Sequence, residues 1–147
     1  MKISIKKTGK LFGDNPSKKL IAALKIELTE ALSEQKDALI KRTRSGKDVR
    51  GQFFKGYTPK YAEKRASMGL QKNPVDLTVT GELLDSILTK VESGLNGKFK
   101  LNLEIANGQK DKAKGLQKKR EFFGNSKEQE KLLLKRLNDL NIKQILK

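Results

Sequence analysis

Residues Val75 to Ile87, Val-Asp-Leu-Thr-Val-Thr-Gly-Glu-Leu-Leu-Asp-Ser-Ile, mark the change from helix-forming to strand-forming character in this chain. Val75, Leu77 and Val79 alternate with polar residues, which is the period-2 pattern of a half-buried strand. Thr80 is suited to cap the helix that follows. The apolar residues of that helix are Leu83, Leu84 and Ile87. The stretch therefore predicts a short strand and then a short helix.

Downstream, residues 88–92 and 99–106 flank the dipeptide Asn96-Gly97, which favours a tight hairpin turn. In the second segment, apolar residues alternate with Lys98, Lys100, Asn102 and Glu104. The apolar set is Phe99, Leu101, Leu103 and Ile105. This alternation predicts an antiparallel hairpin with one face on the core and the other in solvent.

Upstream lies the pattern of a long amphipathic helix. Asn15 and Pro16 are typical of a helix start, and Gly46 marks the end after Arg44. Between them, residues for a buried face recur at three- and four-residue spacing: Leu20, Leu24, Leu28, Ala31, Leu32, Gln35, Ala38 and Leu39. Such a helix is about 43 Å long at the usual rise per residue. It is the natural cover for the apolar face of the hairpin.

The remaining segments complete an α+β prediction. Residues 1–13 form either a short edge strand or a basic arm that binds a partner. Thr58 and Pro59 start a short amphipathic helix that Gly69 closes, with Tyr61, Ala62, Arg65, Ala66 and Met68 on it. A capping box of Ser126 and Gln129 starts a C-terminal helix. We expect one domain over residues 1–147, in which the long helix packs on a small antiparallel sheet of the hairpin plus extra strands.

Composition restricts the classes of function. The 147 residues include 33 Lys and Arg against 17 Asp and Glu, a formal charge of +16. This charge implies a polyanionic neighbour, whether nucleic acid, an acidic protein or an anionic membrane. The absence of Cys and His removes thiol nucleophiles, thiolate zinc sites and the commonest general base. We therefore expect no enzyme activity, cofactor or metal, and no apolar run long enough to span a membrane occurs.

Basic residues are densest in residues 107–120, which we predict to be an exposed loop. They are Lys110, Lys112, Lys114, Lys118, Lys119 and Arg120. Two interpretations remain open, because a run of charge is often simply solvated, whereas the same run can face DNA or a protein partner.

Aromatic residues cluster in two places. Phe53, Phe54 and Tyr57 lie in a glycine-containing loop beside lysines and arginines. They either stack on nucleobases or anchor the loop to the core or to a neighbouring subunit. Phe122 and Phe123 precede Gly124, where we predict a structural corner in which Gly124 positions the Ser126 cap; if its φ is positive, a β-branched residue there would be strained. Glu82 and Asp85 are three residues apart on one predicted helix and could share a metal or perform acid/base work, but no further ligand or nucleophile accompanies them.

Three segments resemble the phage virion morphogenesis proteins, which are the tail-completion or neck proteins of long-tailed bacteriophages. Asp48-Val-Arg-Gly51-Gln-Phe53, running on to Thr58-Pro59-Lys-Tyr61-Ala62, is similar to that family's Gly-x-x-Phe loop and short helix. Leu77-Thr78-Val-Thr80-Gly81-Glu-Leu83-Leu84-Asp-Ser86-Ile87 is similar to its Leu-Thr-x-Thr-Gly-x-Leu-x-x-Ser-Ile element. Arg120-Glu-Phe122-Phe123-Gly124-Asn-Ser126 is similar to its Arg-x-Phe-x-Gly-x-Ser turn. Leu116-Gln117 stands where the family often has His-Gln.

This resemblance implies a structural, non-catalytic subunit of a head-to-tail connector. It implies a homo-oligomeric ring, hexamer or dodecamer, that contacts portal or adaptor and tail proteins. Double-stranded DNA would pass through the lumen without sequence recognition. The expected location is the virion neck, after assembly in the host cytoplasm and away from any membrane. The alternative from charge and aromatics is a basic nucleic-acid-binding module.

Overall fold

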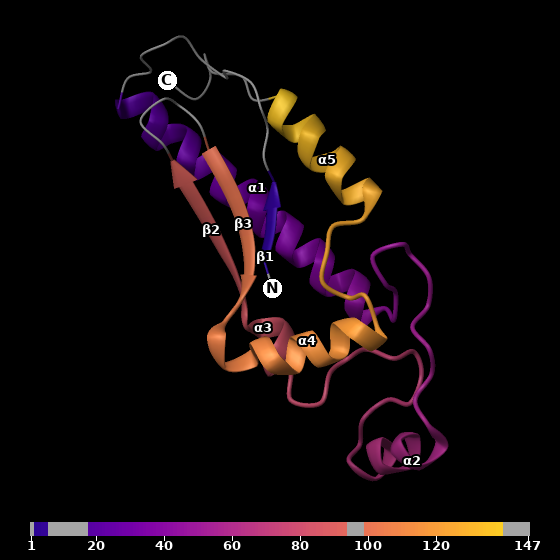
Figure 1. Cartoon of the computed structure of the whole chain (residues 1–147). Helices are drawn as coiled ribbons and strands as arrows, with labels where there is room; N and C mark the ends of the chain where they lie inside the picture. The colour runs from indigo at the N-terminus through magenta and orange to yellow at the C-terminus, as the bar shows by residue number, and fades with distance from the viewer. Residues whose placement is uncertain (1, 6–17, 94–98, 140–147) are drawn as a thin grey trace.

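The computed structural model describes residues 18–93 and 99–139, together with the backbone of residues 2–5. The fold is α+β, and a long N-terminal helix lies across one face of an antiparallel sheet (Figure 1). The elements in chain order are β1 (Lys2–Ile5), α1 (Lys18–Arg44), α2 (Pro59–Ser67), α3 (Glu82–Asp85), β2 (Ile87–Ser93), β3 (Phe99–Ile105), the 3-10 turn η1 (Asn107–Gln109), α4 (Lys110–Lys119) and α5 (Lys127–Asn138).

The sheet has the strand order β1-β3-β2, and both pairings are antiparallel. β2 and β3 form the predicted hairpin, with Ile87 opposite Ile105 and Val91 opposite Leu101. β1 adds an edge strand, with Lys2 opposite Glu104. The turn dipeptide Asn96-Gly97, the helix start at Asn15 and Pro16, and the rest of the basic arm lie outside the described residues.

The core lies between α1 and the sheet. The predicted apolar face of α1 is confirmed, with seven of its eight positions buried and Ala38 half-buried. Its leucines pack with residues of the hairpin, α5 and the segment between α4 and α5. The prediction that Asn102 faces solvent is wrong, because this residue is fully buried. It lies on the central strand, and its backbone is opposite Ser4 of β1 and Lys90 of β2.

The predicted strand over residues 75–79 does not form. Leu77 has a φ of 54°, and the Asp76 Oδ1 atom accepts a hydrogen bond of 3.0 Å from the Thr78 amide. This local side-chain bond replaces the pairing that a strand would need. Val75 is buried and Leu77 packs on the core, so the apolar pattern reflects burial without a strand.

The start of α3 also differs from the prediction. Its N-cap is Gly81, with a φ of 84° and no side-chain cap, so Thr80 does not cap the helix. Glycine adopts a left-handed backbone conformation without steric cost, so Gly81 allows the chain to turn at this point. Leu83 and Leu84 are nevertheless buried, as predicted.

Residues 107–119 form η1 and α4, and Arg120 follows them, so the prediction of an exposed loop over residues 107–120 is wrong. Ala113 is fully buried and Leu116 packs against the core cluster. Lysine and glutamine are good helix formers, and the helix is held on the body by these two contacts and by two hydrogen bonds between the Gln117 side chain and the Phe123 backbone. None of the described helices is long and apolar enough to span a membrane.

The capping box at α5 is confirmed. The Ser126 Oγ atom accepts from the Gln129 amide at 3.2 Å, and Gln129 Oε1 accepts from the Ser126 amide at 2.9 Å. Gly124 is a close-approach position, and because its φ is not positive, a side chain there would be opposed by contact and not by backbone strain. A Cβ added there would lie 2.8 Å from Val49 Cγ1. Two loops distant in sequence therefore pack backbone against side chain at Gly124.

Candidate nucleic-acid interface

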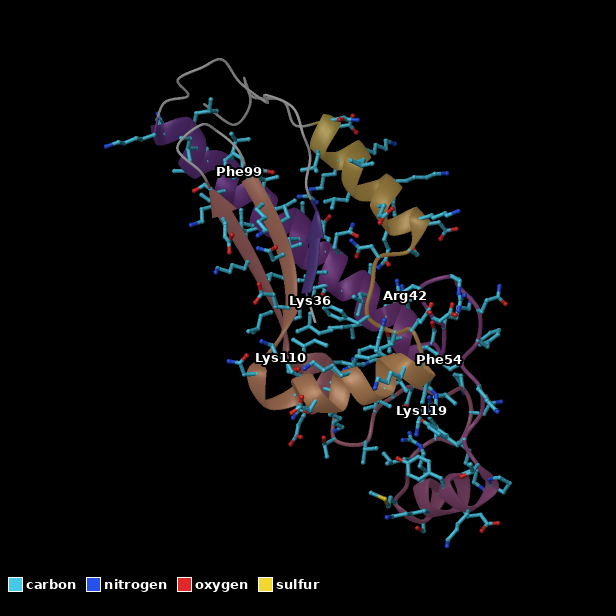
Figure 2. The ribbon with its side chains drawn as sticks, viewed as in Figure 1. Lys36, Arg42, Phe54, Phe99, Lys110 and Lys119 are labelled. Atoms are coloured by element: carbon cyan, nitrogen blue, oxygen red, sulfur yellow. The ribbon has the colours of Figure 1, made fainter. Side chains whose placement is uncertain are left out.

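The basic residues of α4 do not form one cluster. Figure 2 shows Lys110 and Lys119 at opposite ends of the helix. Lys112, Lys114, Lys118 and Lys119 are exposed, whereas Lys110 is half-buried. Lys114 Nζ lies 3.6 Å from Asp111 Oδ1, so part of its charge is offset. The six predicted residues therefore divide between the two ends and different faces of α4.

The C-terminal end of α4 meets the loop that follows α1. Here residues of both segments line a hollow of about 210 Å³, which we call the basic hollow. Its cations are Arg50, Lys55, Lys118, Lys119 and Arg120, and its carboxylates are Asp48 and Glu121. Arg50 Nε lies 3.5 Å from Asp48 Oδ2, and Arg50 Nη2 lies 3.2 Å from Glu121 Oε2. Arg50 therefore neutralises part of the charge of these carboxylates. The remaining cations give the hollow a positive potential that suits phosphate.

The loop at this hollow is a small, well-bonded hairpin. Lys47 pairs with Phe53 in an isolated β-bridge, and Asp48 Oδ1 accepts from the amides of Arg50 and Gln52 at 2.8 and 2.9 Å. The side chains of the two adjacent phenylalanines differ in burial. Phe54 is in the core, whereas Phe53 is 71% exposed with Lys47 Nζ 5.4 Å from its ring centroid. Phe54 is thus a core anchor and Phe53 is available to a partner.

Tyr57 lies between two arginines. The Arg65 guanidinium is 4.6 Å from the ring centroid and the Arg120 guanidinium is 5.4 Å from it. Arg120 is held in place because its Nη2 donates to the Lys55 carbonyl at 3.0 Å. Partial burial raises the pKa of the Tyr57 phenol, and the charge of Arg65 opposes that rise. Tyr57 is therefore an internal anchor. Phe122 and Phe123 are buried in the core as well.

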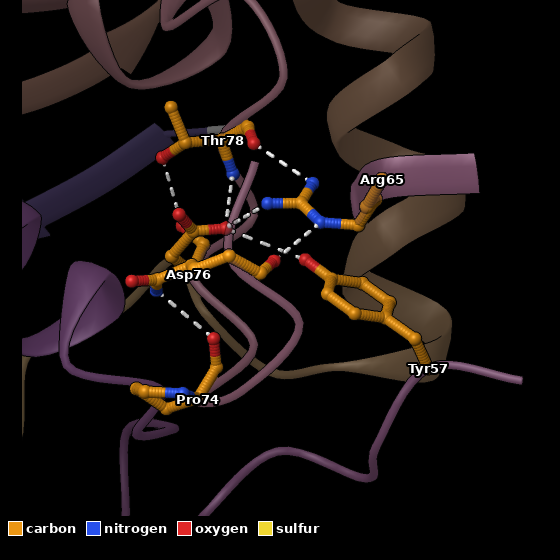
Figure 3. Close-up of polar contacts among 6 residues, drawn as sticks. Tyr57, Arg65, Pro74, Asp76 and Thr78 are labelled. Atoms are coloured by element: carbon orange, nitrogen blue, oxygen red, sulfur yellow. Dashed lines mark hydrogen bonds and ion pairs between the residues drawn. The ribbon is translucent and has the colours of Figure 1, made fainter. Parts of the chain in front are cut away.

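Arg65 is the organising residue that the sequence did not reveal (Figure 3). It is 1% exposed, although it lies on a short surface helix. Its Nε donates to the Gln71 carbonyl at 2.9 Å, Nη1 to the Thr78 carbonyl at 2.8 Å, and Nη2 to Asp76 Oδ1 at 2.9 Å. An arginine among the predicted apolar positions of α2 was the available signal, since buried arginine needs partners on every donor.

The acidic pair on α3 has no partner set for chemistry. Glu82 and Asp85 are exposed, and Asp85 Oδ1 lies 3.7 Å from Arg44 Nη2 across the surface. Over the described ranges, no group of three Asp, Glu, His or Cys residues is arranged to hold a metal ion.

The three segments that resemble neck proteins meet in space. The Val49 amide donates to the Glu121 carbonyl at 2.9 Å, and Arg120 donates to Lys55, so the first segment joins the third. Arg65 joins the helix after the first segment to Asp76 and Thr78 at the second. Comparison with known proteins gives no matching family, no matching curated protein and no matching solved structure.

Proposed function

We propose that this chain is a structural subunit of the head-to-tail connector of a long-tailed bacteriophage. The observation that carries the proposal is the convergence of the three resembling segments around Tyr57, Arg65 and Arg120. Segments far apart in sequence then serve one structural unit, as expected of a scaffold. The arginine side chains at their junction donate hydrogen bonds to backbone carbonyls. Polar groups that are bonded to the protein in this way favour a structural role.

In this proposal the positive surface faces DNA that moves through a ring. A lumen must not hold the duplex so firmly that it cannot slide, so weak phosphate contacts suit it better than base contacts. Exposed lysines on α4 and around the basic hollow meet this requirement. The ring would be a hexamer or a dodecamer, placed between portal or adaptor and tail proteins in the virion.

The α2 region supplies a surface for a neighbouring subunit. Figure 1 shows α2 set apart from the sheet and α1. It exposes Tyr61 and Met68, which are 39% and 54% accessible. Because its fold depends on the Arg65 bonds and little on apolar packing, this region keeps apolar side chains available for contact with another protein.

The direct test is the protein content of phage particles released by the cells that encode the chain. Quantitative mass spectrometry of purified particles should find the chain in about the same low copy number as a portal ring, consistent with closed cyclic symmetry. Antibody labelling should place it at the neck. Particles that lack the chain, or that carry it in hundreds of copies over the capsid, would exclude the proposal.

One observation favours a second candidate, a basic nucleic-acid-binding module. Phe53 is 71% exposed beside Lys47 on a rigid loop, and the loop also lines the basic hollow. An exposed aromatic next to cations is typical of proteins that stack unpaired bases. In this alternative, Phe53 supplies the stacking platform and the lysines track the backbone.

A further inference from the structure

A second basic cavity lies beside the basic hollow. It has a volume of about 920 Å³ and is formed by the end of α1, the loop at residues 45–51 and the start of α5; we call it the α1–α5 cavity. Its cationic lining is Lys41, Arg42, Lys47, Arg50 and Lys127, against the single carboxylate Glu128. Arg50 also lines the basic hollow, so the two sites adjoin.

The start of α5 adds hydrogen-bond donors to this cavity. The capping box occupies the amides of Ser126 and Gln129. The amides of Lys127 and Glu128, in the same first turn, have no acceptor within the helix. The positive end of the helix dipole therefore meets a surface that is already cationic, which is the arrangement that favours a bound anion.

Buried polar atoms in the cavity wall independently indicate a ligand. Gln129 is only 6% exposed, and its Nε2 has no hydrogen-bond partner within the described part of the chain. The Arg42 Nε atom and both polar side-chain atoms of Asn125, Nδ2 and Oδ1, are also buried without a partner in this part of the chain, although these two residues as a whole are half-buried. All three residues line the cavity, and all of these atoms except Asn125 Oδ1 are donors. Buried donors without partners are uncommon in native proteins because each one costs free energy.

The other groups of Arg42 and Gln129 are engaged and fix their positions. Arg42 Nη2 donates to the carbonyls of Phe122 and Gly124 at 2.7 and 2.8 Å, and Nη1 donates to Gln129 Oε1. Burial lowers the pKa of the Arg42 guanidinium, and nearby Asp48 opposes that shift. The wall is therefore built by bonds to the protein, with the unpartnered donors left over.

We propose that the α1–α5 cavity binds a phosphate group. Phosphate carries the charge to balance several cations and has enough oxygen acceptors for separate donors. The site goes beyond the diffuse charge of α4, because it fixes one phosphate at one place. It does not depend on the connector proposal: a phosphate site here is compatible with any function of the chain.

In the test, inorganic phosphate is titrated into the full chain at low ionic strength, and binding is observed by NMR. We expect saturable shifts of the backbone amides of Lys127 and Glu128, of the side-chain NH₂ group of Gln129 and of the Arg42 Nε–H. Chloride at matched ionic strength should not produce them. Acetate that shifts the same signals with equal affinity would overturn the assignment to phosphate and indicate a carboxylate ligand.

Gln129→Glu is the sharpest variant. Glutamate keeps the capping box and the acceptor for Arg42, but it removes the NH₂ donor and adds a negative charge. Phosphate binding should be lost while the melting temperature stays near that of the parent. Unchanged phosphate affinity in this variant would refute the proposal.

A pair of double variants tests the charge. Lys41→Ala with Lys127→Ala should weaken phosphate binding at least about tenfold, since two charge-assisted contacts are removed. Lys131→Ala with Lys135→Ala makes the same change in net charge at exposed positions further along α5, outside the cavity lining. Affinity in this control should stay within about twofold by the screening of distant surface charges. Equal losses in both pairs would show a non-specific effect of charge and contradict the site.

The source of the phosphate is found with a short DNA duplex. If the duplex shifts the same signals and inorganic phosphate competes with it, the site takes a phosphate of the nucleic-acid backbone. If inorganic phosphate shifts them and the duplex does not, the site takes a free phosphate group. Shifts spread evenly over all lysine-bearing surfaces, with no saturation at the α1–α5 cavity, would reject the proposal.

Discussion

Arg65 has the position that an apolar residue usually has in a short amphipathic helix. It is buried on the inner side of α2, and its guanidinium satisfies two backbone carbonyls and one carboxylate of residues 71–78. Its ring contact with Tyr57 completes the arrangement. A loop without regular hydrogen bonding is thereby fixed by one side chain, and this explains how residues 70–81 stay ordered without a strand.

Arg65→Met should therefore destabilise the region strongly. Removal of the cation leaves Asp76, 15% exposed at its side chain, without its ion-pair partner, and breaking a buried pair in this way costs about 3–5 kcal/mol. Urea unfolding and hydrogen exchange at the α2 amides measure the loss. The matched control is Arg44→Met, which breaks an exposed pair worth about 0–1 kcal/mol. Equal stability of the two variants would disprove the role assigned to Arg65.

Gly124 makes a second prediction for a single residue. A side chain there would meet Val49 Cγ1 at 2.8 Å, so Gly124→Val should lower stability by about 1–3 kcal/mol through overpacking. Val49→Ala removes the obstructing methyl group and should recover part of that loss. A double-mutant cycle in urea measures the coupling. Strictly additive effects would mean that the two residues do not contact each other as described.

The Tyr57 phenol should titrate above its ordinary pKa of about 10. In Tyr61→Phe, ultraviolet absorbance follows Tyr57 alone, with the chain in denaturant as the reference. Because the folded pKa is raised, the neutral phenol contributes stability that is fully present below the unfolded pKa and is lost as pH rises through the folded pKa. A titration at or below the reference value would contradict the burial of this side chain.

Among the helices and strands, the period of the apolar residues predicted those elements that pack one whole face on the core. The apolar face of α1 and the pairing of β2 with β3 could be predicted because burial repeats along each of them. The Ser126 capping box could be predicted because it is local. The false strand at residues 75–79 had the right apolar alternation, but a side-chain bond from Asp76 redirected the backbone. The spacing of apolar residues does not show whether such a side-chain hydrogen bond will replace strand pairing.

α4 was missed because its apolar face consists of Ala113 and Leu116 alone. Its helical state makes Gly115→Ala a stabilising change of about 0.5–1 kcal/mol, since glycine in a helix interior has excess freedom to lose. Apart from the adjoining residues and the backbone of the helix itself, no atom lies within 4 Å of the added Cβ. Gly51→Ala is the control: it has the same open space but a φ of 80°, so it should destabilise the protein. Thermal unfolding that ranks the two variants in the opposite order would contradict the helix.

For the molecule as a whole, the sequence predicted the excess of charge but not its distribution. The expected basic segment is divided along α4, and only its end joins Arg50 and Lys55 in a common hollow. The aromatic candidates divide as well, because Phe54, Phe122 and Phe123 are core residues and Phe53 is exposed. These assignments depend on contacts between loops far apart in sequence, which composition and spacing do not contain.

The positive surface should meet nucleic acid through phosphates alone, and the connector proposal depends on this expectation. If about five cations of the described surface contact phosphates, the log-log dependence of affinity on salt should have a slope near −4 to −5. Replacing Lys55, Lys118 and Lys119 by alanine should flatten this slope by about one for each phosphate that the variant no longer binds. Phe53→Ala, which leaves the charge unchanged, is the matched control and should leave the slope unaltered.

Competition binding among unrelated duplexes and single strands, measured from low to high salt, is the decisive measurement for phosphate-only recognition. We predict equal affinities for all sequences among the duplexes, and likewise among the single strands, at each salt concentration, with binding nearly lost at a few tenths molar salt, as counterion release requires. Discrimination among sequences that persists at high salt and disappears in Phe53→Ala would contradict phosphate-only recognition and establish a base-binding module instead.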